Sequence, residues 1–164
     1  MTSDATMMEY LNGLRTFYDG EVYGERVLLA LHAAARTPRE AYHFATILQL
    51  ETETKARLRP LLLRHGLSIA ETADPGAVAA RLASYSDQSW SDYAAATAAR
   101  LRHVLAGYEA IAALGPAEDG EVLDAVVAHE AALVSWAEIE AKGPSEASLA
   151  AIISMLNFPI APPG

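Results

Sequence analysis

Hydrophobic positions recur along most of the chain at spacings of three and four residues, the period of an amphipathic α-helix. Glycine and proline interrupt this pattern at a few places, and no stretch of alternating apolar and polar residues indicates a β-strand. Thr37 followed by Pro38 is a typical helix start, because threonine caps a helix and proline is tolerated at its first position. The pattern therefore predicts an all-helical protein.

The interruptions divide the chain into four long helices and two short ones. The expected helices span 5–36, 38–65, 77–85, 91–114, 119–142 and 145–156. Asp19 and Gly20 predict a possible break in the first helix, and Pro60 predicts a kink in the second. The connector 68–88 is long enough to cross between the two ends of a helical bundle. We therefore expect one domain, 1–164, in which two antiparallel helix hairpins and a crossover form a four-helix bundle with a short C-terminal helix.

Three of the four long helices carry a glutamate near the middle of their apolar stripe, namely Glu25, Glu51 and Glu130. Glu25 precedes Thr37 by 12 residues and Glu51 follows it by 14, so an antiparallel hairpin brings them to nearly the same height. Glu130 lies at a similar depth in the second hairpin. A buried ionised carboxylate costs several kcal/mol unless it is paired, protonated or bound to a metal. The sequence therefore predicts converging carboxylates, with His129 beside Glu130 as a candidate nitrogen ligand.

Three segments in this setting resemble those of uncharacterised bacterial members of the ferritin-like superfamily. These segments are Tyr23-Gly24-Glu25, Leu50-Glu51-Thr52-Glu53-Thr54-Lys55 and His129-Glu130-Ala131-Ala132-Leu133. The resemblance implies one or two metal ions, usually iron, used for oxygen chemistry or metal handling. Family members with two irons carry a Glu-x-x-His pair in each hairpin, whereas the third residues after Glu51 and Glu130 are Thr54 and Leu133.

Two interpretations of the acidic positions follow. In the first, Glu25, Glu51, Glu130 and His129 bind iron or manganese, and the protein is an oxygen-dependent oxidoreductase whose substrate and catalytic residues the sequence does not indicate. In the second, the bundle holds no metal and serves as a small-molecule-binding or interaction module. Glu51 and Lys55 are four residues apart on one helix and pair with each other in that case.

One complete Glu-x-x-His occurs elsewhere, at Glu40 and His43. It lies in the first turns of the second long helix, far from the level of Glu25. A glutamate is favoured there by the helix dipole, so we interpret Glu40 as a helix N-terminal charge. His43 is expected to be partly exposed. This pair is therefore not counted among the predicted metal ligands.

Composition narrows the range of partners. The formal net charge of −9 makes nucleic acid an unfavourable partner, and the basic residues Lys55, Arg57, Arg59 and Arg64 are interpreted as the solvated side of a helix. The absence of cysteine excludes disulfides and thiolate metal sites. No secretory signal and no run of about 20 apolar residues is visible, so we expect a cytoplasmic protein that does not span a membrane.

A homodimer is expected because helices rich in alanine and leucine often leave an apolar stripe uncovered. The stripe would consist of Leu28 and Leu31 on the first helix and Leu61 and Leu63 near the end of the second.

Overall fold

The structure, a computed structural model, describes residues 4–163, which form helices, turns and loops and contain no β-strand. The α-helices are α1 (Asp4–Ala33), α2 (Pro38–Arg64), α3 (Pro75–Ser86), α4 (Trp90–Ala112), α5 (Gly120–Ala141) and α6 (Ala150–Met155), and a 3-10 turn, η1, covers Ala117–Asp119. The prediction of an all-helical protein is confirmed.

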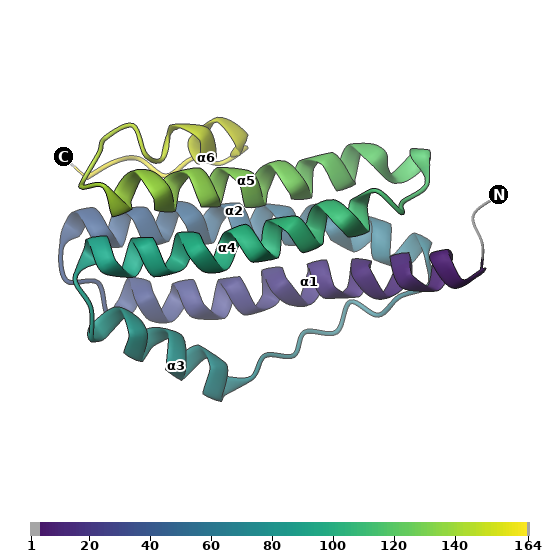
Figure 1. The fold of residues 1–164 in the computed structure, drawn as a ribbon, viewed down its shortest axis with the longest axis horizontal. Coiled ribbons are helices and arrows are strands. Elements are labelled where there is room, and N and C mark those ends of the chain that lie inside the picture. The colour runs from purple at the N-terminus through teal and green to yellow at the C-terminus, as the bar shows by residue number, and fades with distance from the viewer. Residues whose placement is uncertain (1–3, 164) are drawn as a thin grey trace.

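The four long helices lie side by side (Figure 1), and each contributes buried side chains to two hydrophobic clusters. Helix α1 packs along α2 and α4 packs along α5, while contacts of α2 with α5 and of α1 with α4 close the arrangement. Figure 1 shows α1 and α2 running in opposite directions, as α4 and α5 do, whereas α2 and α4 run the same way. The chain between α2 and α4 therefore crosses the length of the molecule, and its helix α3 packs on the outside of α1. Helix α6 packs against α5 and α2.

Local signals in the sequence account for the helix boundaries. The side chain of Thr37 accepts a hydrogen bond from the Glu40 backbone N–H, and Ser89 caps α4 in the same way. Gly66 follows the last residues of α2 with a φ of 69°, a left-handed conformation that glycine adopts without strain. The predicted boundaries of the long helices agree with the observed boundaries to within a few residues. The short C-terminal helix is shorter than predicted, because residues 146–149 form turns ahead of α6.

The predicted break in the first long helix is absent, and the second is not interrupted at its internal proline. Helix α1 continues through Gly20, where the hydroxyl group of Tyr108 occupies the space that a Cβ would need. The glycine therefore permits a close contact between α1 and α4 and does not break α1. Helix α2 continues past Pro60, which lies on its exposed side, to Arg64.

The inward-facing side of α1 differs from the predicted stripe. Leu29 and His32, which follow Glu25 at helical spacing on its predicted apolar stripe, are exposed, Leu29 by 52%. The inward-facing positions instead follow a strict alternation of four-residue and three-residue steps. They are Tyr10, Leu14, Phe17, Glu21, Gly24, Leu28 and Leu31. The interior of α1 therefore contains Glu21, and Glu25 is only half-buried.

The leucines on which the dimer prediction rests do not form an exposed stripe. Leu28, Leu31 and Leu61 are buried within the chain, and only Leu63 is exposed, by 57%. The homodimer stays a prediction without that support. None of the helices formed by residues 4–163 combines the length and hydropathy needed to cross a membrane.

The basic residues of α2 are mostly paired within the chain. Lys55 is buried, contrary to the expectation of a solvated face, and forms ion pairs with Glu25 and Glu71. Arg59 also pairs with Glu71. Glu71 thereby holds the connector to α2, and Lys55 and Arg59 do not form a free basic patch.

Candidate metal centre

Three of the long helices bring acidic side chains together near the middle of the shared interior. Glu21 comes from α1, Glu51 from α2, and both His129 and Glu130 from α5. Glu21 and His129 are 1% and 0% exposed, and the other two are also buried. One potential ligand atom from each of Glu21, His129 and Glu130 lies within 4.8 Å of the other two. Two carboxylates and one imidazole therefore converge at a distance that one cation can bridge.

The imidazole of His129 lies between two of the acids and is held by a hydroxyl group. Its Nδ1 is 2.8 Å from the Oγ1 of Thr54, within hydrogen-bond distance. Its Nδ1 is also 3.6 Å from Glu21 Oε2, and its Nε2 is 3.7 Å from Glu51 Oε1, both too long for a hydrogen bond. The tautomer with the proton on Nδ1 donates to Thr54 and leaves a lone pair on Nε2.

Several buried atoms of this cluster have no hydrogen-bond partner within residues 4–163. They are Glu21 Oε2, Glu130 Oε2 and His129 Nε2. A buried polar atom without a partner costs about 1–3 kcal/mol, and more when the group is charged. The cluster therefore has the composition of a cation site, and three of its potential ligand atoms are left without a partner in the described part of the chain.

Other buried acids of the chain are fully partnered. Asp119 accepts hydrogen bonds from Tyr10 at 2.6 Å and lies 2.7 Å from the Nε2 of His65. Glu140 accepts from Arg39 and from the indole of Trp90, both at 2.6 Å. Burial alone would raise the pKa of Asp119 and Glu140, but these contacts outweigh burial and lower both pKa values. Unsatisfied carboxylates are thus a property of the central cluster and not of buried acids in general.

In the central cluster, by contrast, the pKa values of the buried acids Glu21 and Glu130 are raised. Burial raises the pKa of Glu21 well above its usual range, and the neighbouring carboxylate of Glu51 adds to the shift. Burial also raises the pKa of Glu130 to about 7, although His129 opposes the shift. Burial would lower the pKa of His129, but Glu51 and Glu130 outweigh it and raise that pKa. The cluster therefore retains protons near neutral pH, which a bound cation would displace.

The structure brings together three of the four predicted ligands, Glu51, Glu130 and His129, and adds Glu21. Glu25 is elsewhere: it forms an ion pair with Lys55 and accepts a hydrogen bond from the hydroxyl of Thr52 at 2.7 Å. Lys55 was the alternative partner of Glu51, but it faces Glu25 and Glu71 instead. Glu51 is thereby left facing the interior.

A glycine explains how Glu51 fits against α1. The carboxylate of Glu51 occupies the place where a Cβ on Gly24 would lie. Gly24 is the inward-facing residue directly after Glu21 in the four-and-three pattern of α1, and any larger residue there would displace the Glu51 carboxylate. The regular spacing from Tyr10 to Leu31 is the sequence signal that identifies Glu21. Gly24 weakens this signal, because a glycine does not indicate a buried apolar position.

Glu40 and His43 form no joint site. Glu40 bonds to Arg36 and to the hydroxyl of Tyr85. His43 is buried, contrary to the expectation of partial exposure, and its Nδ1 accepts a hydrogen bond from the indole of Trp136 at 2.9 Å. Burial lowers the pKa of His43 to about 4, so the ring is neutral at physiological pH and its role is structural.

Comparison with family models, curated proteins and solved structures found no match. The function therefore has to be inferred from the chemistry of the cluster.

Proposed function

We propose that this protein binds one divalent transition-metal ion through Glu21, Glu130 and His129, with Glu51 as a fourth group beside them. Two observations support the proposal: each of these three ligand side chains has a buried atom without a hydrogen-bond partner, and one potential ligand atom from each lies within 4.8 Å of the other two. A cation would supply the missing partner to each of them at once. Mutual repulsion of the acids would then become attraction to a shared charge.

Iron and manganese suit this ligand set best. Carboxylate oxygens with one imidazole nitrogen match the preferences of these ions, and thiolate ligands are absent because the chain has no cysteine. Thr54, which stands where a Glu-x-x-His pair would place a histidine, would orient His129 by its hydroxyl in a supporting role. The imidazole ligand would thus come from α5 instead of α2.

We also propose that the four long helices form a ferritin-like four-helix bundle around this ion. The two helix hairpins, the long crossover and the inward acids at mid-length support this assignment. An oxygen-dependent oxidation at the bound metal stays a prediction, as does a cytoplasmic homodimer.

Substitution of Glu130 by glutamine tests the metal site. Titration calorimetry of chelator-treated protein with Mn²⁺ should show an affinity at least about tenfold lower for Glu130→Gln than for the unsubstituted protein, because an anionic ligand is lost. Glu25→Gln is the matched control: Glu25 is engaged by Lys55 and should leave the Mn²⁺ affinity close to that of the unsubstituted protein. Equal affinities for Glu130→Gln and the unsubstituted protein, or a larger loss for Glu25→Gln, would contradict the assignment.

Gly24→Ala should separate metal binding from stability. The added Cβ displaces only the end of the flexible Glu51 side chain, so we expect weaker Mn²⁺ binding with little change in the free energy of unfolding. Gly107→Ala on α4 is the control, since nothing lies within 4 Å of a Cβ there. It should raise the free energy of unfolding by roughly 0.5–1 kcal/mol through helix propensity alone and leave Mn²⁺ binding unchanged. A Gly24→Ala variant that binds Mn²⁺ normally would show that Glu51 is dispensable.

A further inference from the structure

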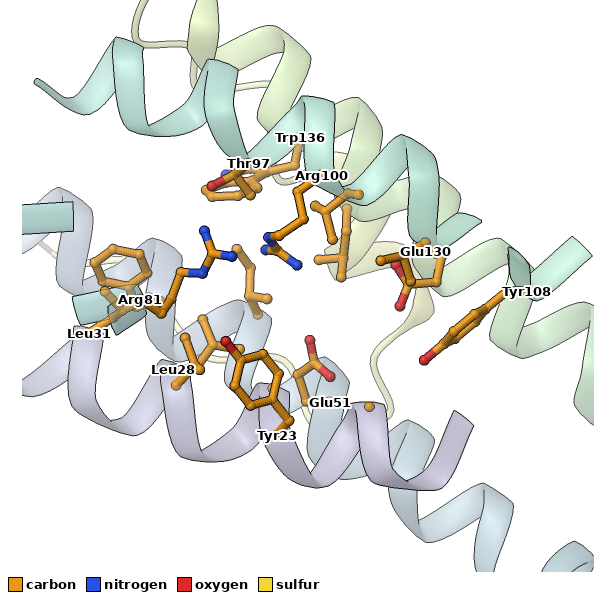
Figure 2. Close-up of a pocket in the computed structure, with 18 of the residues that line it drawn as sticks. Tyr23, Leu28, Leu31, Glu51, Arg81, Thr97, Arg100, Tyr108, Glu130 and Trp136 are labelled. Carbon is orange, nitrogen blue, oxygen red and sulfur yellow. The ribbon is translucent and has the colours of Figure 1, made fainter. Parts of the chain in front are cut away.

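A cavity of about 520 Å³ extends from the acidic cluster into the space between the four long helices and α3 (Figure 2). Glu51 and Glu130 line it, and most of its wall is apolar, including Leu28, Leu31 and Trp136. Pockets that bind small organic molecules typically measure about 300–1,000 Å³ and combine apolar walls with a few polar groups. The cavity therefore has the size and lining of a small-molecule site.

Two arginines point into this cavity from different helices. Figure 2 shows the guanidinium groups of Arg81, on α3, and Arg100, on α4, directed toward each other. The Nε atom of each is buried and has no hydrogen-bond partner within residues 4–163. Neither side chain forms an ion pair with any of these residues.

The other arginines of the chain are placed differently. Seven arginines among residues 4–163 lie within 4.0 Å of an acidic group: Arg15, Arg26, Arg36, Arg39, Arg59, Arg64 and Arg102. Arg57 is exposed to solvent. Arg81 and Arg100 alone among the described arginines combine buried guanidinium nitrogen with the lack of an acidic partner.

This arrangement is electrostatically unfavourable without an anion. Burial and the charge of Arg81 both lower the pKa of Arg100. Glu130 is close enough to interact with Arg100 electrostatically, but no ion pair joins the two side chains. An anion between the guanidinium groups would relieve their repulsion and supply acceptors for their buried N–H groups.

We propose that the cavity binds an amphipathic organic monocarboxylate, its carboxylate held between Arg81 and Arg100 and its apolar body against Leu28, Leu31 and Trp136. Guanidinium groups bind carboxylates through paired hydrogen bonds. A single negative charge fits better than a doubly charged phosphate ester, because Glu51 and Glu130 line the same cavity. The site does not depend on the metal.

The test uses chelator-treated protein, so that it is independent of metal binding. Octanoate, decanoate and naphthoate are titrated in separate experiments and followed by calorimetry and by the fluorescence of the tryptophans, one of which, Trp136, lines the cavity. At least one of these carboxylates should bind, and Arg81→Met and Arg100→Met should each weaken its binding about 10- to 100-fold. Arg102→Met is the matched control. Arg102 lies on α4, as Arg100 does, but at the surface, where it pairs with Glu138 of α5. The Arg102→Met variant should bind as the unsubstituted protein does.

Decanol and decyl phosphate complete the test. Decanol should bind more weakly than decanoate, because it lacks the charge, and decyl phosphate should not surpass decanoate. The proposal is overturned if none of the three carboxylates binds, if decanol binds as tightly as decanoate, or if both arginine variants bind as tightly as Arg102→Met. Tighter binding of decyl phosphate would reassign the site to a phosphate ester. Circular dichroism of each variant checks that the helices remain folded.

Discussion

Asp119→Ala is expected to lower the free energy of unfolding by about 3 kcal/mol. Asp119 is fully buried at the start of α5 and accepts a hydrogen bond from Tyr10 of α1, whose hydroxyl has no exposed surface. It also contacts His65 and Arg64 at the end of α2. One carboxylate therefore joins three helices, and its removal leaves the Tyr10 hydroxyl buried without an acceptor. Urea unfolding followed by circular dichroism measures the change.

Asp124→Ala provides the comparison for this prediction. Asp124 lies on α5 but is exposed, so its removal should change the free energy of unfolding by less than about 0.5 kcal/mol. The folded state lowers the pKa of Asp119, so its contribution is present above the ordinary pKa of an aspartate and is lost as the pH falls through the lowered value. The difference between the two variants should therefore shrink in strong acid. Equal stability of the two variants at neutral pH would show that Asp119 does not stabilise the contacts between α1, α2 and α5.

Mn²⁺ affinity is expected to fall by at least about tenfold for each pH unit below about 7. The pKa of Glu130 is raised to about 7 and that of Glu21 is raised well above its usual range, and both groups must lose their protons to bind a cation. Displacement of both protons makes the fall steeper still. Calorimetric titrations between pH 5 and pH 8 in buffers of different ionisation enthalpy measure both the affinity and the number of protons released.

The stability of the metal-free protein should change with pH in the opposite direction, falling as the pH rises. A carboxylate whose pKa is raised by folding contributes stability below its unfolded pKa and loses that contribution as the pH rises through its folded pKa. For Glu130 this interval runs from the ordinary glutamate value to about 7. Glu130→Gln should remove this part of the pH dependence. A metal affinity that does not change over this range would mean that Glu21 and Glu130 do not bind the ion.

The helices could be predicted from the sequence because their ends are marked by local chemistry. Thr37 and Ser89 cap helices, and Gly66 ends one, and these signals act within a few residues of the chain. The predicted break at Gly20 was wrong for a reason outside the local sequence: Tyr108, 88 residues away, fills the space beside that glycine. From the sequence alone, Gly20 indicates a flexible position. In the structure it permits a close contact between α1 and α4, which depends on tertiary packing.

The site was predicted in part for a related reason. Glu51 and Glu130 lie in apolar stripes with a regular period, so their inward direction could be inferred from spacing. On α1 two alternative stripes compete, one with Glu25 and one with Glu21, and Gly24 weakens the correct one. Lys55 resolves the choice by pairing with Glu25 across the α1–α2 contact. The arginine pair could not be predicted, because Arg81 reaches the cavity from α3, whose packing on α1 has no periodic signal in its own short sequence.

His129 and the buried glutamates are proposed to bind a metal ion together. Pulsed electron paramagnetic resonance of chelator-treated protein loaded with one equivalent of Mn²⁺ at pH 8 tests it most directly. We expect a bound Mn²⁺ whose signal includes coupling to one imidazole nitrogen, and loss of that coupling in His129→Gln. Mn²⁺ that keeps the signal of the hydrated ion, or a nitrogen coupling that survives in His129→Gln, would contradict it.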